Sequence, residues 1–233
     1  KIIAKNNNKF LARAKDSFKD QTYFLHEVSE NEFDRCIFPL ADLTKDEVRE
    51  IALKQNLITA DKKDSVGICF VGERNLKDFL NRFISFSKGD IKDENGNIVG
   101  EHQGSILYTE GQRQGLQIGG VKGANELPWY VYKKDIKNNV IHVCQGVDNE
   151  LLMNSGLFVE KINWINDIEY DLPMNCLVQV RHQHIPVECY LESNNDKIML
   201  TFKDKIRAIA PGQSAVLYDN DICLGGGIIN QTF

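Results

Sequence analysis

The sequence lacks several features that mark common classes of protein. It contains no apolar run near the roughly 20 residues that a membrane-spanning helix requires. It begins without an initiator Met and without the apolar core and small-residue cleavage site of a secretory signal. We therefore expect a soluble protein of the cytoplasm, with no membrane partner, whose given sequence starts partway into a longer chain.

Paired cysteine motifs are also missing. The six cysteines include no C-x-x-C pair, which argues against a zinc site or a thioredoxin-type couple. His142 and Cys144 lack the H-x-E and P-C-x-x-C elements of zinc deaminases. We expect no metal site and mostly free thiols. Cys176 and Cys189 flank an expected hairpin, where they are either a cross-strand core pair or independently buried.

The net charge and the length of the chain exclude fewer classes of protein. A net charge of −5 argues against a uniformly basic nucleic-acid binder, although it leaves local basic patches open. The 233 residues, of which 42% are hydrophobic and 26% charged, can bury a sizeable core and form between one and three domains. Composition alone therefore indicates a globular protein and does not identify its partner.

The first part of the chain predicts a mixture of strand and helix. Thr44 and Glu47 have the spacing of a capping box, and apolar residues follow at helical spacing. These signals predict a helix that starts after Thr44 and ends near Asn56. Such a helix fits the edge of an α/β domain.

The rest of the chain has the patterns of β-structure. A hairpin is expected around Asn95-Gly96, within a mostly β region. Towards the C-terminus, short runs of alternating apolar and polar residues are separated by turn residues. They predict a compact antiparallel β-barrel.

Cys69 lies in "KKDSVGICFVGE", a short apolar run that follows a charged turn. A buried structural cysteine is one interpretation, because free cysteines are among the most buried residues. A reactive thiol is the other, and it needs an electropositive setting that Lys62 and Lys63 could supply. The residues around Cys69 do not decide between the two.

Two short polar stretches are candidates for contact with nucleic acid. Lys19, Asp20 and Gln21 could contact phosphate, ribose or base edges, but they also suit a solvated helix start capped by Asp20. Arg181 and His182 could contact phosphates from a barrel face, although a surface strand explains them as well. Spacing alone favours the structural interpretation for both stretches.

Seven motifs occur in order through essentially the whole chain. They are "KDQTYFL", "FPLADLTKDEVREIA", "KKDSVGICFVGERNLKDFL", "GEHQG", "GQRQGLQIGG", "PWYV" and "PGQSAVLYDNDICLGGGII". In order and spacing they resemble the bacterial-type tRNA-specific 2-thiouridylase (MnmA) family. The resemblance implies the C-terminal part of an α/β ATP-pyrophosphatase domain in residues 1–74, a small mostly β central domain in 75–148 and a C-terminal antiparallel β-barrel in 149–233.

The resemblance also implies an activity. The family replaces the C2 oxygen of the wobble uridine in tRNAs for Lys, Glu and Gln with sulfur, after ATP with Mg has adenylated that oxygen. The sulfur arrives as a persulfide from a donor, either a cysteine desulfurase or a sulfur-relay protein. The family's S-G-G-x-D-S loop and first catalytic cysteine do not occur in this sequence. We expect both upstream, and we expect the given chain to be inactive by itself.

The family's functional residues transfer to individual positions. Cys69 looks like the cysteine that carries the persulfide. The tRNA contacts correspond to Lys19, Asp20, Gln21, Arg181, His182 and Gln213. His182 departs from the aromatic residue often found there, yet an imidazole can still stack on a base.

Two other functions stay open. A noncatalytic RNA-binding module is the main alternative, because small β-barrels commonly serve as binding platforms. A cysteine hydrolase that uses Cys69 is less attractive, because no histidine lies near it in the sequence. An S-G-G-x-D-S loop and a second cysteine upstream would favour the sulfurtransferase.

Overall fold

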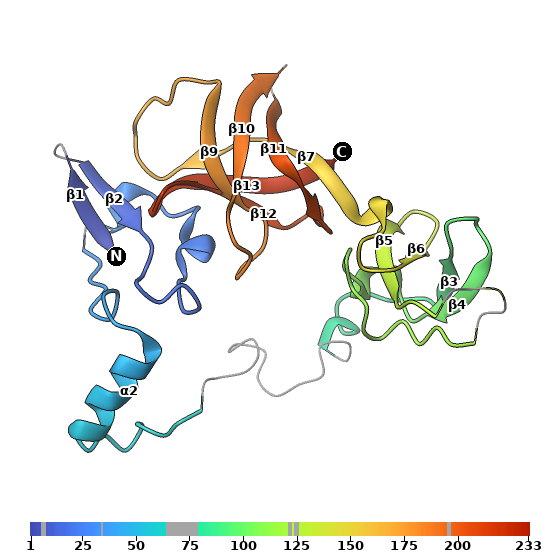
Figure 1. Cartoon of the computed structure of the whole chain (residues 1–233), viewed down its shortest axis with the longest axis horizontal. Coiled ribbons are helices and arrows are strands. Elements are labelled where there is room, and N and C mark those ends of the chain that lie inside the picture. Colours follow the sequence, from blue (N-terminus) through green and yellow to red (C-terminus); the bar gives the residue numbers. More distant parts are fainter. Residues whose placement is uncertain (6–7, 34, 64–78, 121–122, 124–125, 195–196) are drawn as a thin grey trace. The chain divides into compact units, whose positions relative to one another are not determined.

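The computed structural model describes residues 1–5, 8–33, 35–63, 79–120, 123, 126–194 and 197–233 (Figure 1). The chain forms two compact units. One contains residues 1–62, 154–206 and 211–233, and the other contains residues 63–153 and 207–210. The first segment of the chain therefore shares a unit with the C-terminal strands. The expected domain boundaries near residues 74 and 148 stay a prediction.

The first unit is built mainly of strands. Its elements are β1 (Ile2–Lys5), β2 (Asn8–Ala12), the 3-10 helix η1 (Thr22–Leu25), α1 (Glu30–Phe33), α2 (Lys45–Lys54), β7 (Met153–Val159), β8 (Asn163–Trp164), β9 (Met174–Gln179), β10 (Val187–Asn194), β11 (Lys197–Arg207), β12 (Ser214–Asp219) and β13 (Ile222–Thr232). Six of the strands pair in the order β13-β12-β9-β10-β11-β7, and β7 pairs again with β13. This closed circuit confirms the predicted C-terminal barrel. Because β7 pairs with β13, the barrel strands leave no unpaired edge between these two strands.

The N-terminal hairpin of β1 and β2 extends the barrel sheet. Ala12 and Leu11 of β2 pair with Ile222 and Cys223 at the start of β13. Further along β13, Gly225 has a φ of 146°, and a Cβ there would collide with the carbonyl oxygen of Asn163 in β8. Glycine at this point lets β8 pair closely with β13.

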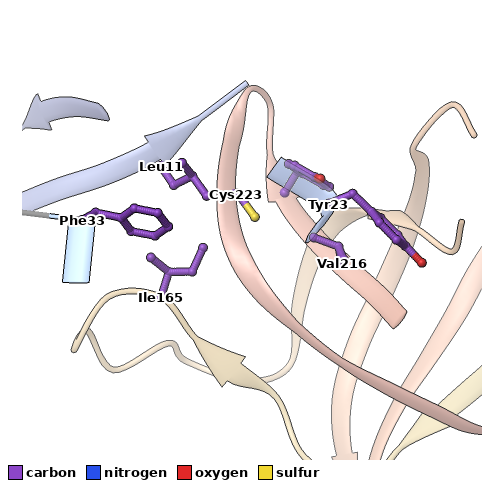
Figure 2. Close-up of a cluster of buried hydrophobic side chains, with 7 residues drawn as sticks. Leu11, Tyr23, Phe33, Ile165, Val216 and Cys223 are labelled. Carbon is purple, nitrogen blue, oxygen red and sulfur yellow. The ribbon is translucent and has the colours of Figure 1, made fainter. Parts of the chain in front are cut away.

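A buried cluster joins the N-terminal segment to the barrel. Figure 2 shows Leu11, Tyr23, Phe33 and Ile165 packed around Val216 and Cys223. Tyr218 completes the cluster and is fully buried. Burying a large apolar side chain contributes about 1.5–3 kcal/mol, so these contacts hold the N-terminal segment on the barrel.

The helix predicted from the capping box is α2. Thr44 accepts a hydrogen bond from the backbone of Glu47, and the Glu47 carboxylate accepts one from the backbone N–H of Thr44. The helix ends at Lys54. Lys15 also contacts the Glu47 carboxylate, at 2.7 Å. That hydrogen bond and the one from Thr44 lower the pKa of Glu47 to about 2.

The second unit contains a separate small sheet. Its elements are β3 (Gly89–Lys92), β4 (Ile98–His102), η2 (Ser105–Leu107), β5 (Trp129–Asp135), β6 (Val140–Gln145) and η3 (Glu150–Leu152). The strand order is β4-β3-β6-β5, with β3 and β6 parallel. The turn between β3 and β4 has Gly96 at a φ of 82° and the Asp93 carboxylate bonded to the backbone of Asn95 and Asn97. This confirms the hairpin expected at Asn95-Gly96.

Candidate functional site

The loop that follows β2 is fixed by two carboxylates. Asp16 accepts backbone N–H groups from Phe18 at 3.0 Å and from Lys45 at 2.8 Å, so it ties the loop to the start of α2. These backbone bonds, above all the one from Lys45, lower the pKa of Asp16. A loop held by several such bonds can present its side chains in defined positions.

Asp20 is the second of these carboxylates. Its side chain is buried and accepts the backbone N–H of Ala14 at 2.9 Å and the hydroxyl of Thr22 at 2.5 Å. Both carboxylate oxygens are thus used within the protein. Lys19 and Gln21, on either side of Asp20, are exposed. The contact of Asp20 with tRNA stays a prediction.

His182 lies against the same loop. Its Nε2 is 3.3 Å from the backbone carbonyl oxygen of Asp20, a contact that requires the Nε2-protonated tautomer. Its ring centroid is 4.5 Å from that of Phe24 and 6.1 Å from that of Tyr23. Phe24 is 58% exposed, so it and His182 form an aromatic surface that solvent can reach.

Tyr23 connects this surface to the start of β12. Its hydroxyl donates to the carbonyl oxygen of Ser214 at 3.0 Å. Burial raises the pKa of Tyr23, while the nearby charge of Arg181 works in the opposite direction. Gln213 directly precedes Ser214 and is exposed. Arg181 and the segment that contains Gln213 and Ser214 therefore both lie near Tyr23.

The strand order of the barrel explains why the segments that carry Arg181, Gln213 and Tyr23 lie close together. In the antiparallel pair of β9 and β12, Gln179 lies opposite Val216. The chain therefore leaves β9, towards Arg181 and His182, at the barrel end where it enters β12 from Gln213. The loop after β2 covers the same end through Tyr23.

A network of polar contacts connects the interior of the barrel to the backbone of Arg181 and to the loop after β2. The guanidinium of Arg13 lies 3.8 Å from the ring centroid of Tyr218 and donates to the Gln179 side chain at 3.0 Å. Gln179 in turn donates to the carbonyl oxygen of Arg181 at 3.2 Å. The Tyr218 hydroxyl is 3.2 Å from the hydroxyl of Thr22. Burial raises the pKa of Tyr218.

The structure describes six of the seven predicted site residues, and their contact with tRNA stays a prediction. Lys19, Asp20, Gln21, Arg181, His182 and Gln213 all belong to the first unit, around one end of the barrel. Cys69 lies outside the described residues. The sequence did not predict the part played by four further residues at this end of the barrel, Arg13, Phe24, Gln179 and Tyr218. Exposed Phe24 next to Tyr23 was visible as an aromatic pair, but no local pattern indicates the buried network.

Comparison with known proteins matches three consecutive family models to the chain. Residues 1–73 match a tRNA methyl transferase HUP domain, residues 77–145 a tRNA methyl transferase PRC-barrel domain, and residues 154–229 an aminomethyltransferase beta-barrel domain. The tRNA-specific 2-thiouridylase MnmA of Buchnera aphidicola subsp. Baizongia pistaciae is 46% identical over 226 residues, which is 97% of this chain and 61% of the relative. The chain belongs to the MnmA family.

Other MnmA relatives give the same picture. The tRNA-specific 2-thiouridylase MnmA of Francisella philomiragia is 47% identical over 220 residues, or 94% of this chain and 61% of the relative. That of Vibrio cholerae is 45% identical over 222 residues, or 95% and 60% respectively. The chain thus spans about 61% of the length of the first relatives it matches. The HUP, PRC-barrel and β-barrel matches confirm the fold class expected from the resemblance.

Two features of the described residues can be compared with a phosphate-binding site for ATP. The glycine-rich stretch Gly111–Gly120 leads into β5 rather than into a helix, whereas such loops place phosphate at a helix N-terminus. The N-terminus of α2 is occupied by the carboxylates of Glu47 and Asp16. These anions would repel a phosphate. Neither feature fits a phosphate of the nucleotide.

The described residues also give no signal of a metal site or of a membrane-spanning helix. Within the described ranges, no three His, Cys, Asp or Glu side chains are grouped so that they could hold a metal ion. Among the helices of the described part, none is both long enough and apolar enough to cross a membrane.

Proposed function

We propose that this chain takes part in the 2-thiolation of the wobble uridine in tRNAs for Lys, Glu and Gln, as part of an ATP-dependent sulfurtransferase. The observation that carries the proposal is the 46% identity with a named tRNA-specific 2-thiouridylase over 97% of the chain. Identity at this level across three consecutive domains is hard to reconcile with a different substrate class. The geometry at the barrel end adds independent support.

The barrel end is the proposed tRNA-binding surface. Lys19 and Arg181 carry positive charge at this end and are assigned to phosphate contacts, which dominate the affinity of proteins for nucleic acids. His182, packed on Phe24 at a ring distance of 4.5 Å, is assigned to stacking on an unpaired base. Gln213 is assigned to a hydrogen bond with the backbone or a base edge.

Asp20 has a different proposed role at this surface. A carboxylate would be repelled by phosphate, and both of its oxygens already accept hydrogen bonds from Ala14 and Thr22. Its carbonyl oxygen also contacts His182. We assign Asp20 to positioning Lys19, Gln21 and His182 for the RNA.

Cys69 is the proposed carrier of the persulfide. A persulfide ionises readily and is a strong nucleophile, so Cys69 can deliver sulfur to the C2 carbon of the uridine by one of two routes. Either the persulfide attacks C2 directly and the upstream cysteine then breaks the S–S bond, or that cysteine first forms a disulfide with Cys69 and releases hydrosulfide, which attacks C2. ATP, with Mg, supplies the activation that makes the C2 oxygen a leaving group. The proposed sulfur donor is a cysteine desulfurase or a sulfur-relay protein. The proposed compartment is the cytoplasm, where tRNA occurs and thiols stay reduced.

Replacing Cys69 with serine tests the proposal. Serine is close in size to cysteine but cannot carry a sulfane sulfur, so Cys69→Ser should abolish sulfur transfer while tRNA affinity stays unchanged. The assay is single-turnover thiolation with labelled persulfide and ATP, measured with the protein in its full natural length and accompanied by a melting curve. Cys36→Ser, at an exposed thiol of the first unit, is the control and should retain activity.

Two results would contradict the proposal. Wild-type rates of thiolation by Cys69→Ser would refute its assignment as the persulfide carrier. Binding of tRNA by the full-length wild-type protein, with no thiolation at any persulfide concentration, would favour the noncatalytic RNA-binding module instead.

A further inference from the structure

A pair of thiols lies on two neighbouring strands of the barrel. Cys176 on β9 and Cys189 on β10 are directly opposite each other in an antiparallel ladder. Their Sγ atoms are 3.5 Å apart. The cross-strand arrangement, left open by the sequence, is the one present in the structure.

The backbone geometry suits a disulfide. Directly opposite residues in an antiparallel pair have Cα atoms about 4.5–5.5 Å apart. Disulfides accept Cα separations of about 4.4–6.8 Å and have an S–S bond of about 2.05 Å. The two sulfurs of Cys176 and Cys189 therefore need to approach by only about 1.5 Å from their 3.5 Å separation. Side-chain rotation can supply this movement without a change of strand register.

The two thiols differ in accessibility. Both line a cavity of about 490 Å³ on the barrel surface. Cys176 is half-buried, whereas Cys189 is only 4% exposed. A small oxidant can therefore reach Cys176 through the cavity, and the Cys189 Sγ is 3.5 Å from the Cys176 Sγ.

The hydrogen bond between the two thiols shifts their pKa values in opposite directions. The bond from Cys189 lowers the pKa of Cys176, while the same bond and burial raise the pKa of Cys189. A thiolate is the nucleophilic form of cysteine. Cys176 is thus the thiol that attacks first, and Cys189 is the thiol that resolves the product.

We propose that Cys176 and Cys189 form an oxidisable dithiol that reacts with hydrogen peroxide to close a reversible cross-strand disulfide. The Cys176 thiolate attacks one peroxide oxygen, the O–O bond breaks, and the leaving hydroxide takes a proton to become water. Cys176 is then a sulfenic acid. The Cys189 sulfur attacks the Cys176 sulfur, the S–O bond breaks, and the departing hydroxide takes the Cys189 proton as a second water. Both thiols are oxidised and one peroxide is reduced.

The disulfide would close the hairpin that carries part of the barrel end. Residues 180–186 connect β9 to β10, and Arg181 and His182 lie in this connection. A covalent link between Cys176 and Cys189 removes conformational freedom from the unfolded hairpin. Oxidation should therefore raise the urea concentration at which the first unit unfolds.

Peptide mapping tests the proposal directly, because trypsin cuts between the two cysteines at Arg181. The wild-type chain is treated with hydrogen peroxide, its remaining thiols are alkylated under denaturing conditions, and it is digested. We expect peptide 162–181 to be joined to peptide 182–197, with the link lost after reduction. In Cys189→Ser, dimedone should instead trap a sulfenic acid on Cys176.

Controls keep the outcome decisive. Cys36→Ser should form the same cross-link, since Cys36 is an exposed thiol on another peptide. Alkylation of both Cys176 and Cys189 in the peroxide-treated wild-type chain would overturn the proposal, as would a cross-link from either one to a different cysteine. The wild-type experiment gives this result even if a serine variant fails to fold.

Discussion

Replacing Asp20 with alanine should destabilise the first unit, because its buried carboxylate holds the loop before η1. Asp20→Ala removes the acceptors of the Ala14 N–H and the Thr22 hydroxyl, whose bonds are 2.9 and 2.5 Å long. A hydrogen bond to a charged group contributes about 1.5–3 kcal/mol. The variant no longer has to bury a charge, which offsets part of this loss. We expect a net loss of about 3 kcal/mol in the free energy of unfolding.

Asp20→Asn is the matched comparison. It preserves the shape of the side chain and one oxygen acceptor, so its loss should be about 1 kcal/mol. The exposed neighbour Ser17 provides a control, since Ser17→Ala should change stability by less than about 0.5 kcal/mol. The order of the three variants is thus set by the number of acceptors that each removes.

The two tryptophans allow the first unit to be measured separately. Trp164 belongs to the first unit and Trp129 to the second. In a Trp129→Phe background, urea unfolding followed by fluorescence reports on the first unit alone. With an m-value of about 2 kcal/mol/M, Asp20→Ala should lower the midpoint by about 1.5 M. Equal midpoints for Asp20→Ala and Ser17→Ala would refute the buried role of the carboxylate.

Three further outcomes are expected. Lys19→Ala and Arg181→Ala should each weaken tRNA binding and reduce the salt slope by about 0.7–0.9, measured by fluorescence anisotropy over a salt series; unchanged slopes would make them ordinary surface charges. Phe24→Ala should weaken tRNA binding about tenfold with no change in salt slope, because it removes the ring that packs on His182, and the stacking contact assigned to His182 is worth about 1–3 kcal/mol. The lowered pKa of Glu47 means that its stabilisation of α2 is complete above pH 4.5 and is lost as the pH falls towards about 2. Hydrogen exchange of α2 should show this loss in the wild type, whereas Glu47→Gln should show a smaller one, because Asp16 still titrates at the start of the helix.

The local elements were predictable because their signals are local. The capping box of Thr44 and Glu47 starts α2, and Asn95-Gly96 forms the turn between β3 and β4. Alternating residues likewise indicated the strands of the barrel. Each of these patterns acts over a few residues through backbone geometry, so the sequence alone carries it.

The arrangement of the candidate site was less predictable. His182 and Asp20 are 162 residues apart, and Tyr218 and Thr22 are 196 residues apart. Neither hydrogen bond leaves a pattern in the surrounding sequence. The site residues came from family resemblance, which indicates roles without showing that Asp20 is buried or that Phe24 packs on His182.

Closure of the barrel provides the physical link between these distant segments. With Gln179 opposite Val216, the loop leaving β9 and the loop entering β12 must share one end. That end receives Arg181 and His182 from the first loop and Gln213 from the second. A slip of one residue in the pairing of β9 would turn its side chains to the opposite face and move these loops apart. The proposed RNA surface therefore depends on strand register throughout the barrel, and mutations in the barrel core should weaken tRNA binding even where no RNA contact is lost.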